Sequence, residues 1–237
     1  MKSFYGEQWS EHIRTRICPR FRQFGDLVLS RVLPVFEGIN EEAYALERRR
    51  YEELMSGIDA PEEDLWDAGE AMAEQAFNEA MAHAVLLESM RYATINLNAA
   101  ALYHLTEQHL IDLVLRIHDN DEQHKHRPEA AIAWFKDALG LDLSTLPSWP
   151  VIEELRHVAN VVKHGEGGSA AKLRELRPDL FVYPSLRKDG ARPMGLRLEM
   201  TLFGQDFFVA EADFERYREV SVALWTEIGE ALLKLPR

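Results

Sequence analysis

The sequence lacks the features that mark secreted and membrane proteins. It has a single cysteine, Cys18, among 237 residues, so no disulfide can form within the chain. The first residues, MKSFYGEQWSEHIRTR, contain no continuous apolar run of the kind found in signal peptides. No stretch approaches the roughly 18–20 consecutive apolar residues that a membrane-spanning helix needs. We therefore expect a cytoplasmic protein with no membrane association.

The chain also lacks the common motifs of cofactor and metal sites. The patterns GxxxxGK[ST], GxGxxG after a strand, GxSxG and HExxH are all absent, which argues against the sites that those motifs mark. A single cysteine excludes the cysteine pairs of structural zinc sites. The glycine-rich stretch 165–170 follows a predicted helix, whereas a phosphate-binding loop precedes one. We expect neither a cofactor nor a metal.

Positive charge is scarce over residues 51–100. This segment holds eleven acidic residues and one basic residue, Arg91, a net charge of −10 in a chain whose total is −13. Non-specific binding of nucleic acid needs a broad basic face, so it is excluded for the molecule as a whole. Residues 151–200 hold nine basic and seven acidic residues, which leaves room for a local basic site. The acidic segment is either a solvated helix face or a docking surface for a basic partner.

Helical periodicity dominates the chain. Apolar residues recur at helical spacing in successive runs, most of them bounded by proline or glycine: 7–17, 21–38, 40–57, 59–118, 128–139, 148–164 and 213–233. We expect a mainly α protein, a helical bundle with long central helices plus a small C-terminal antiparallel β-hairpin and a terminal helix. It would be a single domain, 1–237, made of N-terminal helices, a helical core, and the hairpin with the terminal helix, at 1–58, 59–178 and 179–237.

The run 59–118 is too long for a typical helix of a globular domain. Asparagine, threonine and β-branched residues gather at 92–98, where we expect a break. The run would then form two long helices or one long bent helix. Residues 102–118 are apolar around most of the helix circumference, which predicts the central buried helix of the bundle.

The periodicity changes near the C-terminus. Residues 196–200 alternate between apolar and polar side chains, and the largely apolar stretch 206–209 follows across Gly204 and Gln205. Alternation with period two followed by a short turn is typical of paired strands. These residues are the predicted β-hairpin, and 213–233 is the terminal helix.

The stretch 148–168 is the best candidate for chemistry. Ser148 and Pro150 begin a predicted helix, and glycines from Gly165 onward end it. Its apolar residues fall on one stripe, which would face the core. The remaining surface carries two imidazoles, an amide and two cations: Arg156, His157, Asn160, Lys163 and His164.

Glu107 and His104 lie one turn apart on the predicted central helix. A carboxylate on a mostly buried helix is costly unless it is paired, and Arg156 or Lys163 is the obvious partner. The pair is then either purely structural or a support that orients the cationic site from behind.

The pattern Arg156-x-x-x-Asn160-x-x-Lys163-His164-Gly165, with the upstream YHLTEQ at 103–108, resembles the HEPN superfamily (the higher eukaryotes and prokaryotes nucleotide-binding domain). The resemblance implies a helical bundle that is often dimeric. Many members are metal-independent endoribonucleases that act as toxins or phage-defence effectors, with a composite site across the dimer interface. Their usual motif has four to six residues between the arginine and the histidine, whereas seven separate Arg156 from His164.

The resemblance also implies a role for each polar residue. Cleavage of RNA without a metal needs an acid, a base and a cation at the phosphate. His164 would be the acid or base, Arg156 would hold the phosphate, and Asn160 would position it. Lys163 and His157 would add phosphate contacts, and the neighbouring Arg156 would disfavour the imidazolium form of His157. The expected partners are an RNA substrate, a second copy of the chain, and a neutralising or sensor protein.

Two other functions stay open. The chain could be a non-catalytic helical interaction or regulatory subunit that binds a protein partner through residues 51–100 or through a helix surface. It could also be a metal-binding bundle that uses His104, Glu107 and a second helix.

Overall fold

The structure is a computed structural model that describes residues 6–58, 61, 65–118, 127–187 and 197–235. It confirms a mainly α protein with a helical bundle. The α-helices, in chain order, are α1 (Gly6–His12), α2 (Cys18–Leu27), α3 (Ile39–Ser56), α4 (Leu65–His118), α5 (Pro128–Leu139), α6 (Trp149–His164), α7 (Gly168–Leu176), α8 (Pro184–Arg187) and α9 (Glu211–Leu233). Among these residues, no helix has the length and apolar character that crossing a membrane would require.

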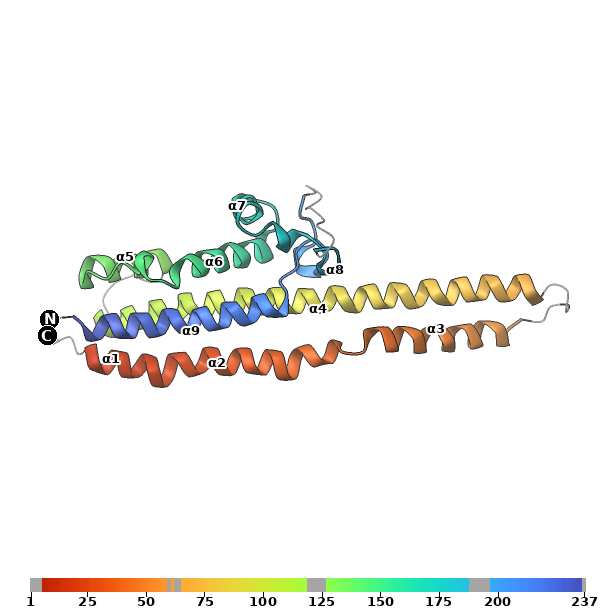
Figure 1. The fold of residues 1–237 in the computed structure, drawn as a ribbon, viewed down its shortest axis with the longest axis horizontal. Helices are drawn as coiled ribbons and strands as arrows, with labels where there is room; N and C mark the ends of the chain where they lie inside the picture. Colours follow the sequence, from red (N-terminus) through yellow and green to blue (C-terminus); the bar gives the residue numbers. More distant parts are fainter. Residues whose placement is uncertain (1–5, 59–60, 62–64, 119–126, 188–196, 236–237) are drawn as a thin grey trace.

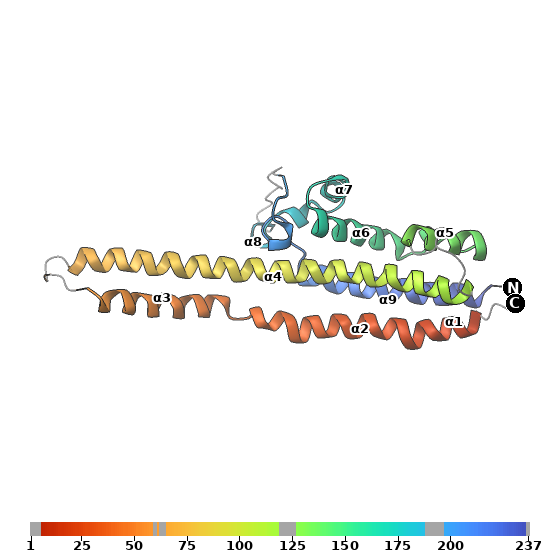
Figure 2. The ribbon, with the colours of Figure 1, turned by 180° about the vertical axis from the view of Figure 1, so that it is seen from behind.

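Helix α4 is the axis of the molecule (Figure 1). It spans 54 residues, about 80 Å at the usual rise of a helix. Its C-terminal half lies among α1, α2, α6 and α9, and these elements form the bundle. Its N-terminal half, up to residue 90, pairs with α3, and the two project from the bundle as the α3/α4 hairpin (Figures 1 and 2).

The expected break at 92–98 was wrong, because α4 continues through it. The polar side chains there are satisfied without opening the helix. Thr94 and Asn98 donate to the carbonyl groups of Met90 and Thr94, four residues earlier. Asn96 is fully buried and bonds to the chain at 207–209. These residues have a low preference for helices. The helix continues because their side chains form hydrogen bonds, either within α4 or to the segment 207–209.

The core of the bundle lies between α4, α6 and α9. His109 of α4 is 9% exposed and packs against Phe21 of α2 and Trp225 of α9, with ring centroids 5.9 Å away in both cases. Burial lowers the pKa of His109 and keeps its ring neutral. The predicted core stripe of α9 is confirmed: Phe214, Tyr217, Leu224 and Ile228 are fully buried, and Val220 is partly buried.

The predicted β-hairpin was wrong for the residues that the structure describes. Leu196 lies outside them, and residues 197–209 contain the short 3-10 turn Thr201–Phe203 and no strand. Backbone N–H groups of this segment, which would bond to a neighbouring strand in a hairpin, bond to a side chain instead. Asp206 accepts the backbone N–H groups of Glu199 and Met200 at 3.0 and 2.8 Å. Of the two described apolar residues in the alternating stretch, Leu198 is buried and Met200 is about half exposed, so the alternating polarity does not mark a ladder of strands.

Gly204 sets how closely this segment approaches α4. Its φ is +68°, in the left-handed region that glycine tolerates best. A Cβ at this position would lie 2.1 Å from the carbonyl oxygen of Ser89 and 2.5 Å from the backbone nitrogen of Ala93. Glycine therefore allows residues 201–209 to lie directly on the middle of α4.

Candidate active site

Helix α6 carries most of the predicted site, and its ends are as expected. Pro150 lies in its first turn, and Gly165 ends it with φ 69°. Ser148 precedes the helix, but its hydroxyl donates to Glu227 of α9 at 2.7 Å instead of capping the backbone. The stripe that faces the core is buried: Ile152, Leu155, Val158, Ala159, Val161 and Val162. The polar residues are thereby held on the outer side of the helix.

Arg156 lies where α6 meets α4. Its Nη2 donates to Glu153 at 2.8 Å, and its buried Nε has no hydrogen-bond partner in the described part of the chain. Tyr103 of α4, which is 8% exposed, lies near both Arg156 and Glu107. The positive charge of Arg156 lowers the pKa of the Tyr103 phenol, and the negative charge of Glu107 raises it. Burial and the nearby Glu107 carboxylate raise the pKa of Tyr103 well above its usual range, so the phenol is neutral.

Glu107 has a different partner from the predicted ones. His104 Nδ1 lies 2.7 Å from Glu107 Oε2, one turn away on the same helix. Arg156 takes Glu153 at the same three-residue spacing. Neighbours within one helix reach each other with little loss of side-chain freedom, so the local pairs form in preference to one across the helices. His104 and Glu107 thus lie behind Arg156 without an ion pair to it.

His157 points toward the start of α7. Its Nδ1 lies 3.3 Å from the hydroxyl of Ser169. Burial lowers the pKa of His157, and the Arg156 charge lowers it further. The predicted effect of Arg156 is therefore confirmed, although burial contributes more. His157 is the more enclosed of the two imidazoles on α6.

The C-terminal end of α6 opens onto a pocket of about 590 Å³. Lys163 and His164 are both exposed there, and Arg197 from the segment after α8 lies on the same pocket. The pocket is also lined by Gly165, Glu166 and residues 198–203. An imidazole and two cations thus share one open hollow.

Two acids line this pocket, Glu166 and Glu199, and the charge of Glu166 is balanced by Arg174. Both of its oxygens accept from Arg174, at 2.6 and 2.7 Å, and the backbone N–H of Leu198 donates to it at 3.1 Å. These donors lower the pKa of Glu166 to about 2. Glu166 therefore fixes residue 198 beside the end of α6. Because Arg174 already balances its negative charge, Glu166 does little to offset the positive charges of Lys163 and Arg197.

Arg156 is not among the residues that line this pocket. It lies eight residues before His164, about 12 Å earlier along the helix axis. Asn160 is half-buried midway between them. Within one chain, the arginine and the histidine of the motif therefore belong to different surroundings, the α4–α6 boundary and the open pocket.

A partly buried ion network that the motif did not predict holds α6 against α9. Glu154 is 13% exposed, and its Oε1 accepts from Arg177 at 2.8 Å and from Tyr217 at 2.6 Å, as well as from Arg216. Arg177 also donates to Asp213 at 2.7 Å. Four charged groups and a phenol thus fix α6 relative to the start of α9.

Two residues of the site were missed from the sequence. Arg197 lies in a segment predicted as a strand, and nothing in its local pattern points to the end of α6. Tyr103 belongs to the YHLTEQ stretch, but its place beside Arg156 depends on how α4 packs against α6. The places of both residues depend on contacts between segments distant in the sequence, and the residue pattern within one helix does not predict such contacts.

The described residues contain no group of three His, Cys, Asp or Glu side chains that could hold a metal ion. His104 and Glu107 form a pair, and the third ligand that the metal-binding alternative needs does not join them among these residues.

Comparison of the chain with models of known protein families, with curated proteins and with solved structures finds no significant match to any of them. Any functional assignment therefore has to be argued from the chemistry of the site.

Proposed function

We propose that this protein is a HEPN-like endoribonuclease that cleaves RNA without a metal ion, with its site at the pocket where α6 ends. One observation carries the proposal: His164, Lys163 and Arg197 converge on a single open hollow. An imidazole can exchange a proton near neutral pH, and the two cations can bind a phosphate. The exposed position of all three makes the pocket accessible to an extended polymer.

The reaction would use the 2′-hydroxyl of the RNA as nucleophile. His164 takes the proton of this hydroxyl, whose oxygen then attacks the adjacent phosphorus, or it gives a proton to the departing 5′-oxygen. Lys163 and Arg197 stabilise the negative charge that grows on the phosphate oxygens. Among the described residues, one chain places one imidazole at this pocket, so a homodimer that brings two pockets together would supply acid and base separately.

The remaining motif residues would extend the site along α6. RNA that leaves the pocket along the polar side of the helix meets Asn160 and then Arg156, which would bind a neighbouring phosphate. His157 would add a contact at the α7 side. Tyr103, Glu107 and His104 lie behind Arg156 and would hold its surroundings in place.

Cleavage of a single-stranded RNA by the purified chain in EDTA tests this proposal. The His164→Ala variant should cleave at least about 100-fold more slowly, since a positioned acid or base typically contributes that much. His83→Ala is the matched control, because His83 lies on the α3/α4 hairpin and pairs with Glu42. Equal cleavage by the His164→Ala and wild-type chains would refute the proposal.

The biological role can be tested with the same pair of variants. A toxin or phage-defence effector that acts through this site should arrest bacterial growth when the wild-type or His83→Ala chain is expressed, and His164→Ala should relieve the arrest. Arrest by the His164→Ala chain to the same degree would show that the pocket is not the toxic element.

A further inference from the structure

The α3/α4 hairpin is a two-helix structure with one open side. Ala76 and Ala80 of α4 are buried against α3, and Ile39 and Ala43 of α3 are buried in turn. Arg50 of α3 donates to Glu79 of α4 at 2.6 Å. In both views, α3 is the only described helix beside this part of α4 (Figures 1 and 2). The opposite side of α4 therefore has no helix against it.

That open side of α4 is apolar. Trp66 is 81% exposed, Phe77 49%, Met81 45% and Val85 56%. Phe77, Met81 and Val85 follow one another at four-residue spacing, so they form one stripe along the helix. Trp66 lies on the same side, three turns earlier. A single exposed apolar residue needs no explanation, but a stripe of four large ones marks an interaction surface.

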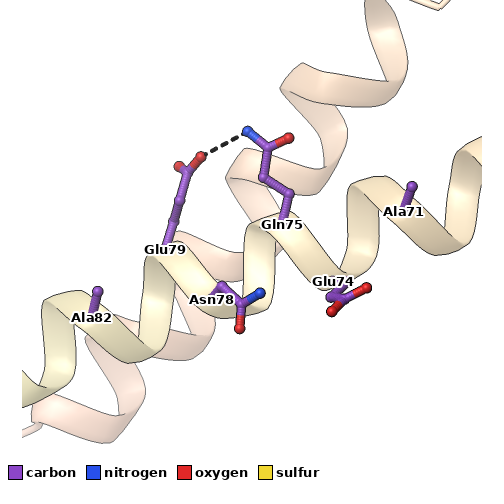
Figure 3. A pocket seen from close by; sticks show the side chains of 6 residues that line it. All are labelled: Ala71, Glu74, Gln75, Asn78, Glu79 and Ala82. Atoms are coloured by element: carbon purple, nitrogen blue, oxygen red, sulfur yellow. Dashed lines mark hydrogen bonds between the residues drawn. The ribbon is translucent and has the colours of Figure 1, made fainter.

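This half of α4 is also strongly acidic. Residues 65–90 contain no lysine or arginine, and they hold Asp67, Glu70, Glu74, Glu79 and Glu88, of which Glu79 pairs with Arg50 of α3. Glu70 and Glu74, next to the apolar stripe, make no ion pair with any described residue. Beside the stripe lies a shallow hollow that runs along α4 from Ala71 to Ala82, and four polar residues between them line it: Glu74, Gln75, Asn78 and Glu79 (Figure 3).

We propose that this face, the stripe Trp66, Phe77, Met81 and Val85 with its flanking carboxylates, docks a basic amphipathic helix of another protein. A third helix would cover the apolar stripe, and lysine or arginine at its flanks would pair with Glu70 and Glu74.

Charge decides between the possible occupants. The hairpin, 39–58 with 65–90, holds ten acidic and three basic residues, a net charge of −7. A second copy of the hairpin would bring the same charge to the contact and be repelled. An anionic membrane surface is disfavoured for the same reason. A helix with an apolar stripe and basic flanks is the occupant that satisfies both properties of the face.

Binding of a synthetic peptide to the full chain tests this inference. The probe is a fluorescein-labelled amphipathic helix with leucines along one stripe and lysine and arginine at the flanks, and its match has glutamate at every flanking position. Anisotropy should show binding of the basic peptide and none of the acidic one. Raising NaCl from about 0.05 to about 0.5 M should weaken binding, because solvent-exposed charges are screened.

Two variants assign the binding to the face. Phe77→Ser combined with Met81→Ser should weaken binding about tenfold or more, as expected for apolar anchors of an interface. Leu176→Ser, which removes an exposed apolar side chain on α7, is the control and should bind normally. Both variants change exposed residues, and equal thermal unfolding would confirm that each is folded.

Any of three results would overturn the inference. These are failure of the basic peptide to bind, equal binding by the acidic peptide, or unchanged binding by the double variant. A homodimer that dissociates on Phe77→Ser and Met81→Ser would also overturn it, because the occupant would then be a second copy. None of these outcomes depends on RNA cleavage, which is proposed for the pocket where α6 ends.

Discussion

Helix α4 passes through two different surroundings. In the bundle it is covered by helices on several sides, and residues such as Ile95, Leu102 and Val114 are at most 1% exposed. In the hairpin it has α3 on one side, and Phe77 and Val85 are about half exposed. The continuous helix therefore joins a core to a projecting arm.

The difference shows what each half contributes. Apolar burial stabilises the fold in proportion to the area removed from water, so the bundle supplies most of the stability. The hairpin leaves apolar area exposed to water and concentrates negative charge. Repulsion between these charges destabilises the hairpin on its own, and a basic partner that covers the apolar area would stabilise it. The proposed RNA site lies on the bundle, where α6, α9 and the segment 197–209 hold its residues in place. The following changes test this division.

The largest expected effect is on the ion network of the bundle. Glu154→Ala leaves Arg177 and Arg216 without the shared carboxylate and the Tyr217 hydroxyl without its acceptor. Loss of one member of a fully buried ion pair costs about 3–5 kcal/mol, so for this partly buried network the free energy of unfolding measured in urea should fall by about 3 kcal/mol, the lower end of that range. Glu74→Ala on the hairpin is the control and should change it by less than about 0.5 kcal/mol. Equal losses for the two variants would contradict the comparison.

A smaller loss is expected from the contact between α4 and residues 207–209. Asn96→Ala removes two hydrogen bonds, at 2.7 and 3.0 Å, and leaves the Phe207 carbonyl and the Val209 N–H buried. The cost should be about 2–3 kcal/mol in urea unfolding. Asn98→Ala, two residues further along α4, loses a bond within its own helix and should cost under about 1 kcal/mol. A larger loss for Asn98→Ala would mean that the segment does not depend on Asn96.

The smallest effect concerns pH. Burial lowers the pKa of His109 from 6.5, so the folded state favours the neutral ring. The unfolded chain binds a proton below about pH 6.5 that the folded chain resists, so this part of the stability is present above that pH and is lost as the pH falls below it. His109→Leu should flatten the decline in unfolding free energy between about pH 6.5 and pH 5. An unchanged decline in the His109→Leu variant would count against burial of this ring as the cause.

The sequence predicted the helices whose stripes and ends are local. The ends of α6 at Pro150 and Gly165, and the core stripe of α9 from Phe214 to Ile228, depend on residues within one helix, and both are confirmed. The break at 92–98 and the strands at 196–209 were predicted from local preference. Two side chains explain why that local preference does not decide the structure. Asn96 bonds to backbone groups at 207 and 209, far away in the sequence, and Asp206 bonds to the backbone N–H groups of residues 199 and 200 across a turn.

The site divides in the same way. The exposure of Lys163 and His164 follows from their place at the end of an amphipathic helix. Arg197 and the Glu154 network depend on how α6 meets distant segments, and the ion pairs of Arg156 and Glu107 were decided by neighbours one turn away. Whether Arg156, Asn160 and His164 act on RNA stays a prediction.

Hydrogen exchange of the His164→Ala chain with a single-stranded RNA oligonucleotide tests the central claim most directly, because this variant should bind RNA without cleaving it. We expect RNA to slow exchange at the end of α6, residues 161–166, and at 197–203, and to leave exchange at residues 66–90 of the hairpin unchanged. Slower exchange at 66–90 without protection at the end of α6 would show that the RNA binds the α3/α4 hairpin, and would contradict the proposed site.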